Sequence, residues 1–192
     1  MNTLQLPEGY QRIYAIDLQR DKKTAWLLNG LALIILVLMI GLGFILRRSF
    51  TVDITQMIVF FVAMVVYTVL HEVVHGVFIR LYSGEKPKFG FTGLYAYAGN
   101  DRAYFDKKSY IVIALSPVII LGAVLLLLQF LIPSYFWVIY FLQALNIAGA
   151  SGDYLVVYLC GRMPRDLLIN DTGVAMYFYS RQPLKRSGEY EA

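Results

Sequence analysis

This chain of 192 residues is 58% hydrophobic and only 16% charged, and its mean hydropathy is +0.59. Such a composition excludes an ordinary soluble domain and predicts an integral membrane protein. The net charge of +4 is too small to indicate nucleic-acid binding. The single cysteine, Cys160, excludes an intramolecular disulfide and a thiolate cluster, so any bound metal must take nitrogen and oxygen ligands.

The first part of the chain predicts a polar segment followed by two membrane spans. Residues 1–24 are mixed and polar, which fits a cytoplasmic segment that is either a short surface helix or a solvated tail. Residues 25–46 carry no charge, are long enough to cross the bilayer, and begin too late for a cleavable signal peptide. Arg47 and Arg48 end this span, and a second span is expected over about residues 57–79.

A polar interval follows the second span, over about residues 80–109. Four glycines, one proline and most of the loop charges interrupt the apolar pattern there. Within it, residues 88–98 predict a small hairpin at the membrane surface, although an interfacial loop anchored by aromatic residues fits the pattern equally well. In an extended chain, four aromatic side chains would share one side and could contact a substrate: Phe89, Phe91, Tyr95 and Tyr97.

Two further spans are expected, over about residues 111–132 and 136–160. Pro117 interrupts the first of them and frees a backbone carbonyl, which neighbouring helices or water can satisfy. The second half of the last span is unusually polar for a membrane helix, because it carries Asn146 and Asp153. These two residues therefore need a specific role.

The expected fold is an all-α membrane protein with four transmembrane helices and a small cytoplasmic-side hairpin or loop between the second and third. Residues 25–160 form the membrane domain, with an interfacial loop at 80–109, and residues 161–192 form a tail. The N-terminal segment, this loop and the tail carry 15 of the 17 Lys and Arg residues. Because cationic loops stay in the cytoplasm, we expect a multi-pass protein of the cell membrane with both termini inside.

Both histidines of the chain lie in the segment His71-Glu72-Val73-Val74-His75. Residues four apart share a helix face, so the two imidazoles can reach one metal ion with Glu72 beside it. An ionisable residue in a membrane span costs about 3 kcal/mol unless it is paired or ligating. The segment therefore indicates a Zn2+ site rather than a solvated helix face, and Glu72 is expected to be the catalytic base.

The depth of the spans suggests the third ligand. His71 is nine residues from Arg80, and Asp153 is nine residues from Arg162, which places both about 13 Å from the cytoplasmic end. Asp153 is the expected ligand, although a helix-packing hydrogen bond or a cap would also use it. Gly149 and Gly152, with Ala148 and Ser151, favour close packing of this span against the second one. Five other acidic residues fall in expected loops, where charge needs no special role: Glu85, Asp101, Asp106, Asp166 and Asp171.

Asn146 precedes Asp153 by seven residues, two turns back on the same helix face. It could donate a hydrogen bond to a substrate carbonyl or to the oxyanion that develops from it. An ordinary amide contact between helices is an equally good reading.

These residues resemble a family of small bacterial membrane proteins known as putative zincin peptidases and, more distantly, the site-2-protease group of intramembrane zinc metalloproteases. The resemblance rests on His71-Glu72-x-x-His75 and on the segment from Asn146 to Asp153, with the aromatic loop between them. In site-2 proteases an Asn, a Pro and a Leu-Asp-Gly lie on the later helix, and the aspartate completes the zinc site. Here the aspartate lies in Gly152-Asp153-Tyr154 and the proline is missing. The resemblance implies that Lys88 to Ala98 holds an extended substrate.

The predicted function is a zinc-dependent peptidase that cleaves membrane-associated proteins or peptides near the cytoplasmic face. Two alternatives stand beside it. A metal or proton transporter would line its pathway with the same His, Glu and Asp residues, and a catalytically inactive scaffold would keep the fold only to bind membrane proteins. The expected partners are the lipid bilayer and a membrane protein or peptide substrate, and the sequence does not indicate an oligomeric state.

Overall fold

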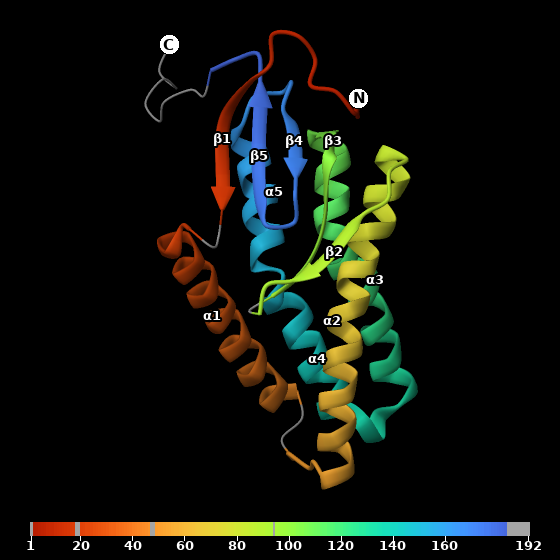
Figure 1. The fold of residues 1–192 in the computed structure, drawn as a ribbon. Helices are drawn as coiled ribbons and strands as arrows, with labels where there is room; N and C mark the ends of the chain where they lie inside the picture. Colours follow the sequence, from red (N-terminus) through yellow and green to blue (C-terminus); the bar gives the residue numbers. More distant parts are fainter. Residues whose placement is uncertain (1, 18–19, 47–48, 94, 184–192) are drawn as a thin grey trace.

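A five-stranded antiparallel sheet lies at one end of a set of helices (Figure 1). Arg47 and Arg48 of the expected first span, and residues 184–192 of the expected tail, lie outside the described part of the chain. The computed structural model describes residues 2–17, 20–46, 49–93 and 95–183.

The sheet brings the two ends of the chain together. Its first strand in sequence pairs along its length with its last, and Ile16 and Phe178 from these strands are buried. The N-terminal segment is thus neither a surface helix nor a solvated tail, because residues Gln11–Asp17 form a strand that pairs with β5 and buries Ile16. The strand order is β1 (Gln11–Asp17), β5 (Ala175–Ser180), β4 (Leu168–Asp171), β3 (Ala96–Asp106) and β2 (Lys88–Phe91), with every neighbour antiparallel.

Three helices in the described residues are long and apolar enough to cross a membrane. They are hydrophobic nearly all round, and most of their large apolar side chains are exposed, as suits contact with lipid. Their bounds are α1 (Lys22–Leu46), α2 (Ile54–Ser83) and α3 (Lys107–Leu131). A short 3-10 turn, η1 (Pro133–Tyr135), then leads to α4 (Phe136–Gly149) and α5 (Ser151–Arg162), which return the chain to the sheet.

The expected all-α fold with four spans is wrong. The sheet accounts for one part of the error, and the other is the last apolar run, which breaks at Ala150 into two short helices. The 14 residues of α4 rise only about 21 Å, less than the hydrocarbon thickness of about 30 Å. Glycine and serine near the break favour it because both weaken a helix interior.

The main core lies between the sheet and the adjoining ends of α2, α3 and α5. Strand residues Phe105, Ile169 and Phe178 are completely buried there, and Ile79 and Ile113 reach the same core from α2 and α3. The sheet is therefore packed directly against the helix ends that adjoin the His-Glu-x-x-His segment.

The predicted hairpin within residues 88–98 is present as β2 and β3, but β3 continues into the larger sheet. The register places Phe89 opposite Ala98 and Gly90 opposite Tyr97. Directly opposed residues share a face, whereas consecutive residues alternate. The expected grouping of all four aromatic side chains on one side is therefore wrong, since Phe89 and Tyr97 point to opposite faces.

Candidate metal centre

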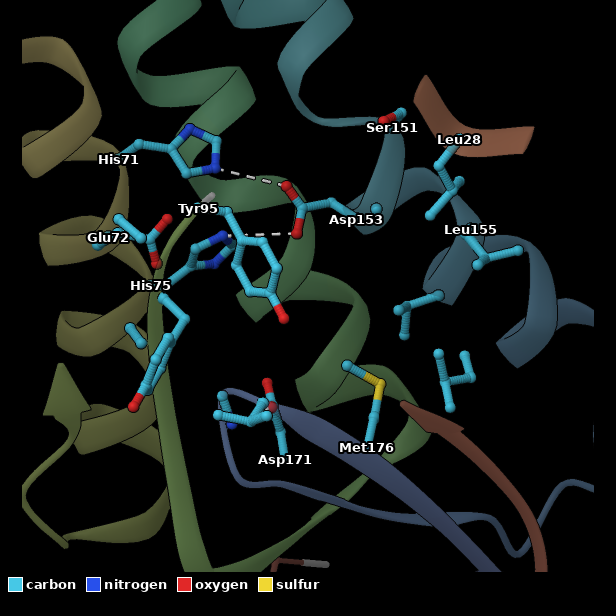
Figure 2. Close-up of a pocket in the computed structure, with 18 of the residues that line it drawn as sticks. Leu28, His71, Glu72, His75, Tyr95, Ser151, Asp153, Leu155, Asp171 and Met176 are labelled. Atoms are coloured by element: carbon cyan, nitrogen blue, oxygen red, sulfur yellow. Dashed lines mark hydrogen bonds and ion pairs between the residues drawn. The ribbon is translucent and has the colours of Figure 1, made fainter. Parts of the chain in front are cut away.

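The three expected metal ligands meet between α2 and α5. Nε2 of His71 lies 3.4 Å from Oδ2 of Asp153, and Nε2 of His75 lies 3.5 Å from Oδ1 (Figure 2). Two ligand atoms bound to one tetrahedral ion at about 2.1 Å lie about 3.4 Å apart. The ligand atoms of the three residues all lie within 4.8 Å of one another, so one ion can bind them together.

The helix that carries the motif is well defined at both ends. The side chain of Asp53 accepts a hydrogen bond of 2.8 Å from the backbone N–H of Gln56, which forms a capping box at the start of α2. Gly84 ends the helix with φ of +75°. Between these caps the helical period places His71 and His75 one turn apart on one face.

His75 is held by a backbone carbonyl that a proline frees. Pro117 has no N–H, so the carbonyl of Ile113 in α3 lacks its usual helical donor. Nδ1–H of His75 donates to this carbonyl at 2.9 Å, and Oγ of Ser116 also donates to it. The proton on Nδ1 leaves Nε2 with its lone pair directed at the metal position.

His71 is held by side chains instead. The hydroxyl of Tyr67 donates to Oδ1 of Asn146 at 2.8 Å, so its oxygen accepts from Nδ1–H of His71 at 3.1 Å. Nδ2 of Asn146 donates in turn to the carbonyl of Val118 at 3.1 Å. Asn146 is buried and does not line the cavity. It is linked to His71 only through the hydroxyl of Tyr67. Sequence reasoning did not identify Tyr67, although it precedes His71 by one helical turn.

The break between α4 and α5 places Asp153 in the first turn of α5. A carboxylate is favoured there by the positive end of the helix dipole. Gly149 and Gly152 were expected to permit close packing of α2 against this segment, but no heavy atom lies within 4 Å of a Cβ added at either. Both line the cavity instead, so the helix break, rather than close packing at these glycines, accounts for the position of Asp153.

A cavity of about 530 Å³ opens beside the three ligands and Glu72. The carboxylate of Glu72 lies next to both imidazoles (Figure 2). Tyr95 and Tyr97 also line the cavity, whereas Phe89 and Phe91 lie outside it and are 54% and 72% exposed. The four aromatic residues expected to contact substrate are thus split into two pairs, and only the tyrosines line the cavity.

The profile of a family described as "Putative zincin peptidase" matches residues 64–168, more than half of the chain. The chain belongs to this family. The match includes the motif on α2 and extends through Asp153, so it covers the whole metal centre. Family membership confirms the predicted relationship and the prediction of zinc, and it makes the protein a metallopeptidase in general terms. No curated protein and no solved structure matches the chain.

The donor set fits the metal of a zincin peptidase. Two imidazole nitrogens and one carboxylate oxygen are typical of catalytic zinc, which binds three protein ligands and leaves one position open. Hydrogen bonds at both Nδ1 atoms fix the tautomers that such binding requires. The negative charge of Asp153 would be neutralised by the ion, which explains a carboxylate in this largely apolar part of the protein.

Asp171 is a second acidic residue of the cavity, and sequence reasoning set it aside as a loop charge. It ends β4 and is buried, and Figure 2 places it across the cavity from Asp153. The hydroxyl of Tyr110 and the N–H of Gly173 donate to its two oxygens, the latter at 2.8 Å. Burial raises the pKa of Asp171, and these hydrogen bonds oppose the rise. The sequence spacing does not link Asp171 to the His-Glu-x-x-His motif, because Asp171 reaches the cavity only through the folding of the sheet.

Proposed function

We propose that this protein is a zinc peptidase of the His-Glu-x-x-His type, distantly related to site-2 proteases, that cleaves membrane-associated substrates near the cytoplasmic face. The convergence of His71 and His75 on Asp153, with Glu72 beside them in a cavity, carries this proposal. Two imidazoles and one carboxylate that can bind zinc, with a second carboxylate at the cavity wall, are the groups that hydrolysis of an amide by this route requires.

Each side chain then has a chemical task. Bound zinc would polarise the scissile carbonyl and lower the pKa of water. Glu72 would accept a proton from the attacking water on a carboxylate oxygen and pass it to the leaving amine. The hydrogen bonds from the two Nδ1 atoms would keep the Nε2 lone pairs in position throughout. The apolar cavity wall would exclude bulk water from the reacting groups.

The substrate would bind in extended form along the β2–β3 hairpin. β2 is the last strand in the sheet order, so within the described residues one of its edges is not paired with another strand. Such an edge can pair with the backbone of a peptide. Tyr95 and Tyr97 would then contact substrate side chains inside the cavity, and Phe89 and Phe91 would contact substrate or lipid outside it. A helical substrate would have to unwind first, because its peptide bonds are shielded.

The sheet and both termini would lie in the cytoplasm. The apolar helices α1, α2 and α3 extend away from the sheet and are suited to the bilayer. The cationic residues of the N-terminal segment and of the interval after α2 gather at the sheet end, which favours the cytoplasmic side. The protein would therefore be a multi-pass protein of the cell membrane with its metal centre close to that side.

The substitution Glu72→Gln tests this function on the full chain in detergent. The variant should keep about one zinc per protein and lose cleavage of a fluorogenic peptide library by at least about 100-fold, because it lacks only the proton acceptor. Glu8→Gln is the matched control, since the same chemical change occurs on an exposed residue outside the cavity. Zinc-loaded wild type that cleaves no peptide, but carries zinc or protons into liposomes, would contradict the proposal.

A further inference from the structure

We propose that Asp171 forms a subsite that binds a cationic group of the substrate, an ammonium or a guanidinium, in the cavity beside the metal centre. This inference rests on the proposed peptidase function and specifies the class of substrate. It concerns a residue that takes no part in binding the metal or in proton transfer.

The carboxylate of Asp171 has neutral partners only. The hydroxyl of Tyr110 and the N–H of Gly173 each donate one hydrogen bond to it. Within the described residues no Lys or Arg forms an ion pair with it. A buried carboxylate without a cation is costly, and a substrate cation would remove that cost.

Asp101, an acidic residue on the surface, differs from Asp171 in having a cationic partner within the protein. Its carboxylate lies 2.6 Å from Nζ of Lys88 and has a side-chain exposure of 46%. Asp171, by contrast, is 9% exposed and lines the cavity. The exposed carboxylate has a cation from the protein itself, whereas the buried one faces a space that a ligand can enter.

The cavity that contains the metal centre and Asp171 has several apolar residues in its wall, among them Ile79, Ile113, Val156 and Met176. A lysine or arginine side chain has a long apolar stem and a charged tip, so its stem would contact this wall while its tip reached Asp171. A free α-amino group offers the same positive charge without the stem.

A close backbone contact holds Asp171 in this place. The turn after β4 passes so near β3 that a Cβ added at Gly99 would lie 2.5 Å from the carbonyl carbon of Thr172. Gly173 in the same turn has φ of +84° and packs against the ring of Tyr97. The position of the carboxylate is therefore set by the sheet, as a recognition residue requires.

Peptide binding to the zinc-loaded Glu72→Gln protein, measured by fluorescence anisotropy, tests the subsite without cleavage. The probes are N-acetylated, C-amidated peptides in pairs. The two peptides of a pair differ at one position, which is lysine in one and norleucine in the other, and this position changes from pair to pair. The lysine peptide should bind at least about ten-fold more tightly at one position, as expected for a buried charge pair. A norleucine peptide with a free N-terminus shows whether an α-amino group serves instead; tighter binding of that peptide alone would assign the subsite to a substrate N-terminus.

Two variants test whether Asp171 causes the tighter binding of the cationic peptide. Asp171→Asn, added to Glu72→Gln, should abolish it, while the matched control Asp166→Asn, at a carboxylate outside the cavity, should keep it. Met176→Lys offers an independent check, because residue 176 lies opposite Asp171 in the β4–β5 register and would supply an internal cation. That variant should also abolish the preference, even if Asp171→Asn does not fold.

The outcomes separate this inference from the peptidase proposal. Equal binding of the cationic and neutral peptides, a preference that survives Asp171→Asn, or no binding of any peptide would overturn the subsite. A preference for the cationic peptide without cleavage by the wild type would keep the subsite and reject the peptidase. Cleavage without any preference would keep the peptidase and reject the subsite.

Discussion

The surroundings of His71 and His75 differ although both imidazoles face the same carboxylate. His71 is held by the side chains of Tyr67 and Asn146, whereas His75 is held by the backbone carbonyl of Ile113. Side-chain support can be removed by one substitution. Backbone support depends on the helix geometry that Pro117 creates. One face of α2 thus supplies both ligands, but their supports differ: α4 acts on His71 through Tyr67, and α3 acts on His75 directly.

Removing the group that both histidines share should have the largest effect. Asp153→Ala leaves two imidazoles as the only protein ligands, so zinc affinity should fall by more than about 100-fold, beyond the usual effect of an outer contact. Competition with a chromophoric zinc chelator measures the affinity. Asp166→Ala is the control, because Asp166 bonds Ser180 and Arg181 away from the cavity. Unchanged affinity in Asp153→Ala would remove Asp153 from the ligand set.

Tyr67→Phe should have the next largest effect, because it removes only the hydroxyl that accepts from Nδ1–H of His71. We expect zinc affinity to fall by about ten-fold, within the range for residues that orient metal ligands. Tyr158→Phe is a matched control on the exposed surface of α5. Equal affinities for the two variants would show that the contact at 3.1 Å does not orient His71.

Asn146→Ala distinguishes two roles for this residue. If Asn146 acts through Tyr67, zinc affinity should fall by a few-fold, less than in Tyr67→Phe, because the tyrosine hydroxyl remains. Peptide cleavage at saturating zinc should then be nearly normal. A fall in kcat of about 100-fold with normal zinc affinity would instead assign Asn146 to stabilising the oxyanion.

The smallest effect is expected for Pro117→Ala. The substitution restores an N–H that can bond the carbonyl of Ile113 and compete with His75. Zinc affinity should fall by no more than about two-fold, since His75 can still share the carbonyl. Pro133→Ala, in η1 between α3 and α4, is the control. A loss as large as that of Tyr67→Phe would show that the two histidines depend equally on their supports.

The parts of the fold that sequence predicts are those with local signals. Helix α2 and its motif follow from apolar composition and four-residue spacing, and comparing depths in two spans indicated Asp153. Strand β1 could not be predicted, because its partner β5 lies more than 150 residues away in the chain. The break at Ala150 was hidden within one continuous apolar run.

The supports of the site were only partly visible in the sequence. The sequence showed that Pro117 frees a carbonyl, but it did not show that His75 binds this carbonyl, because His75 and Ile113 are 38 residues apart and lie on different helices. Tyr67 lies one helical turn before His71 on α2, a local signal that sequence reasoning overlooked. Asp171 carries no spacing signal, and only tertiary packing brings it to the cavity. Residues that bind the metal therefore follow a pattern, whereas the residues that hold His75 or extend the site depend on the fold.

Zinc X-ray absorption of the purified full-length protein tests the metal centre most directly. With one zinc per chain, we expect two imidazole nitrogens and two oxygens at about 2.0–2.1 Å, and loss of one of the two imidazole nitrogens in each of His71→Ala and His75→Ala. Correctly folded wild type that takes up no zinc, or a zinc ion with no imidazole ligand, would contradict the account.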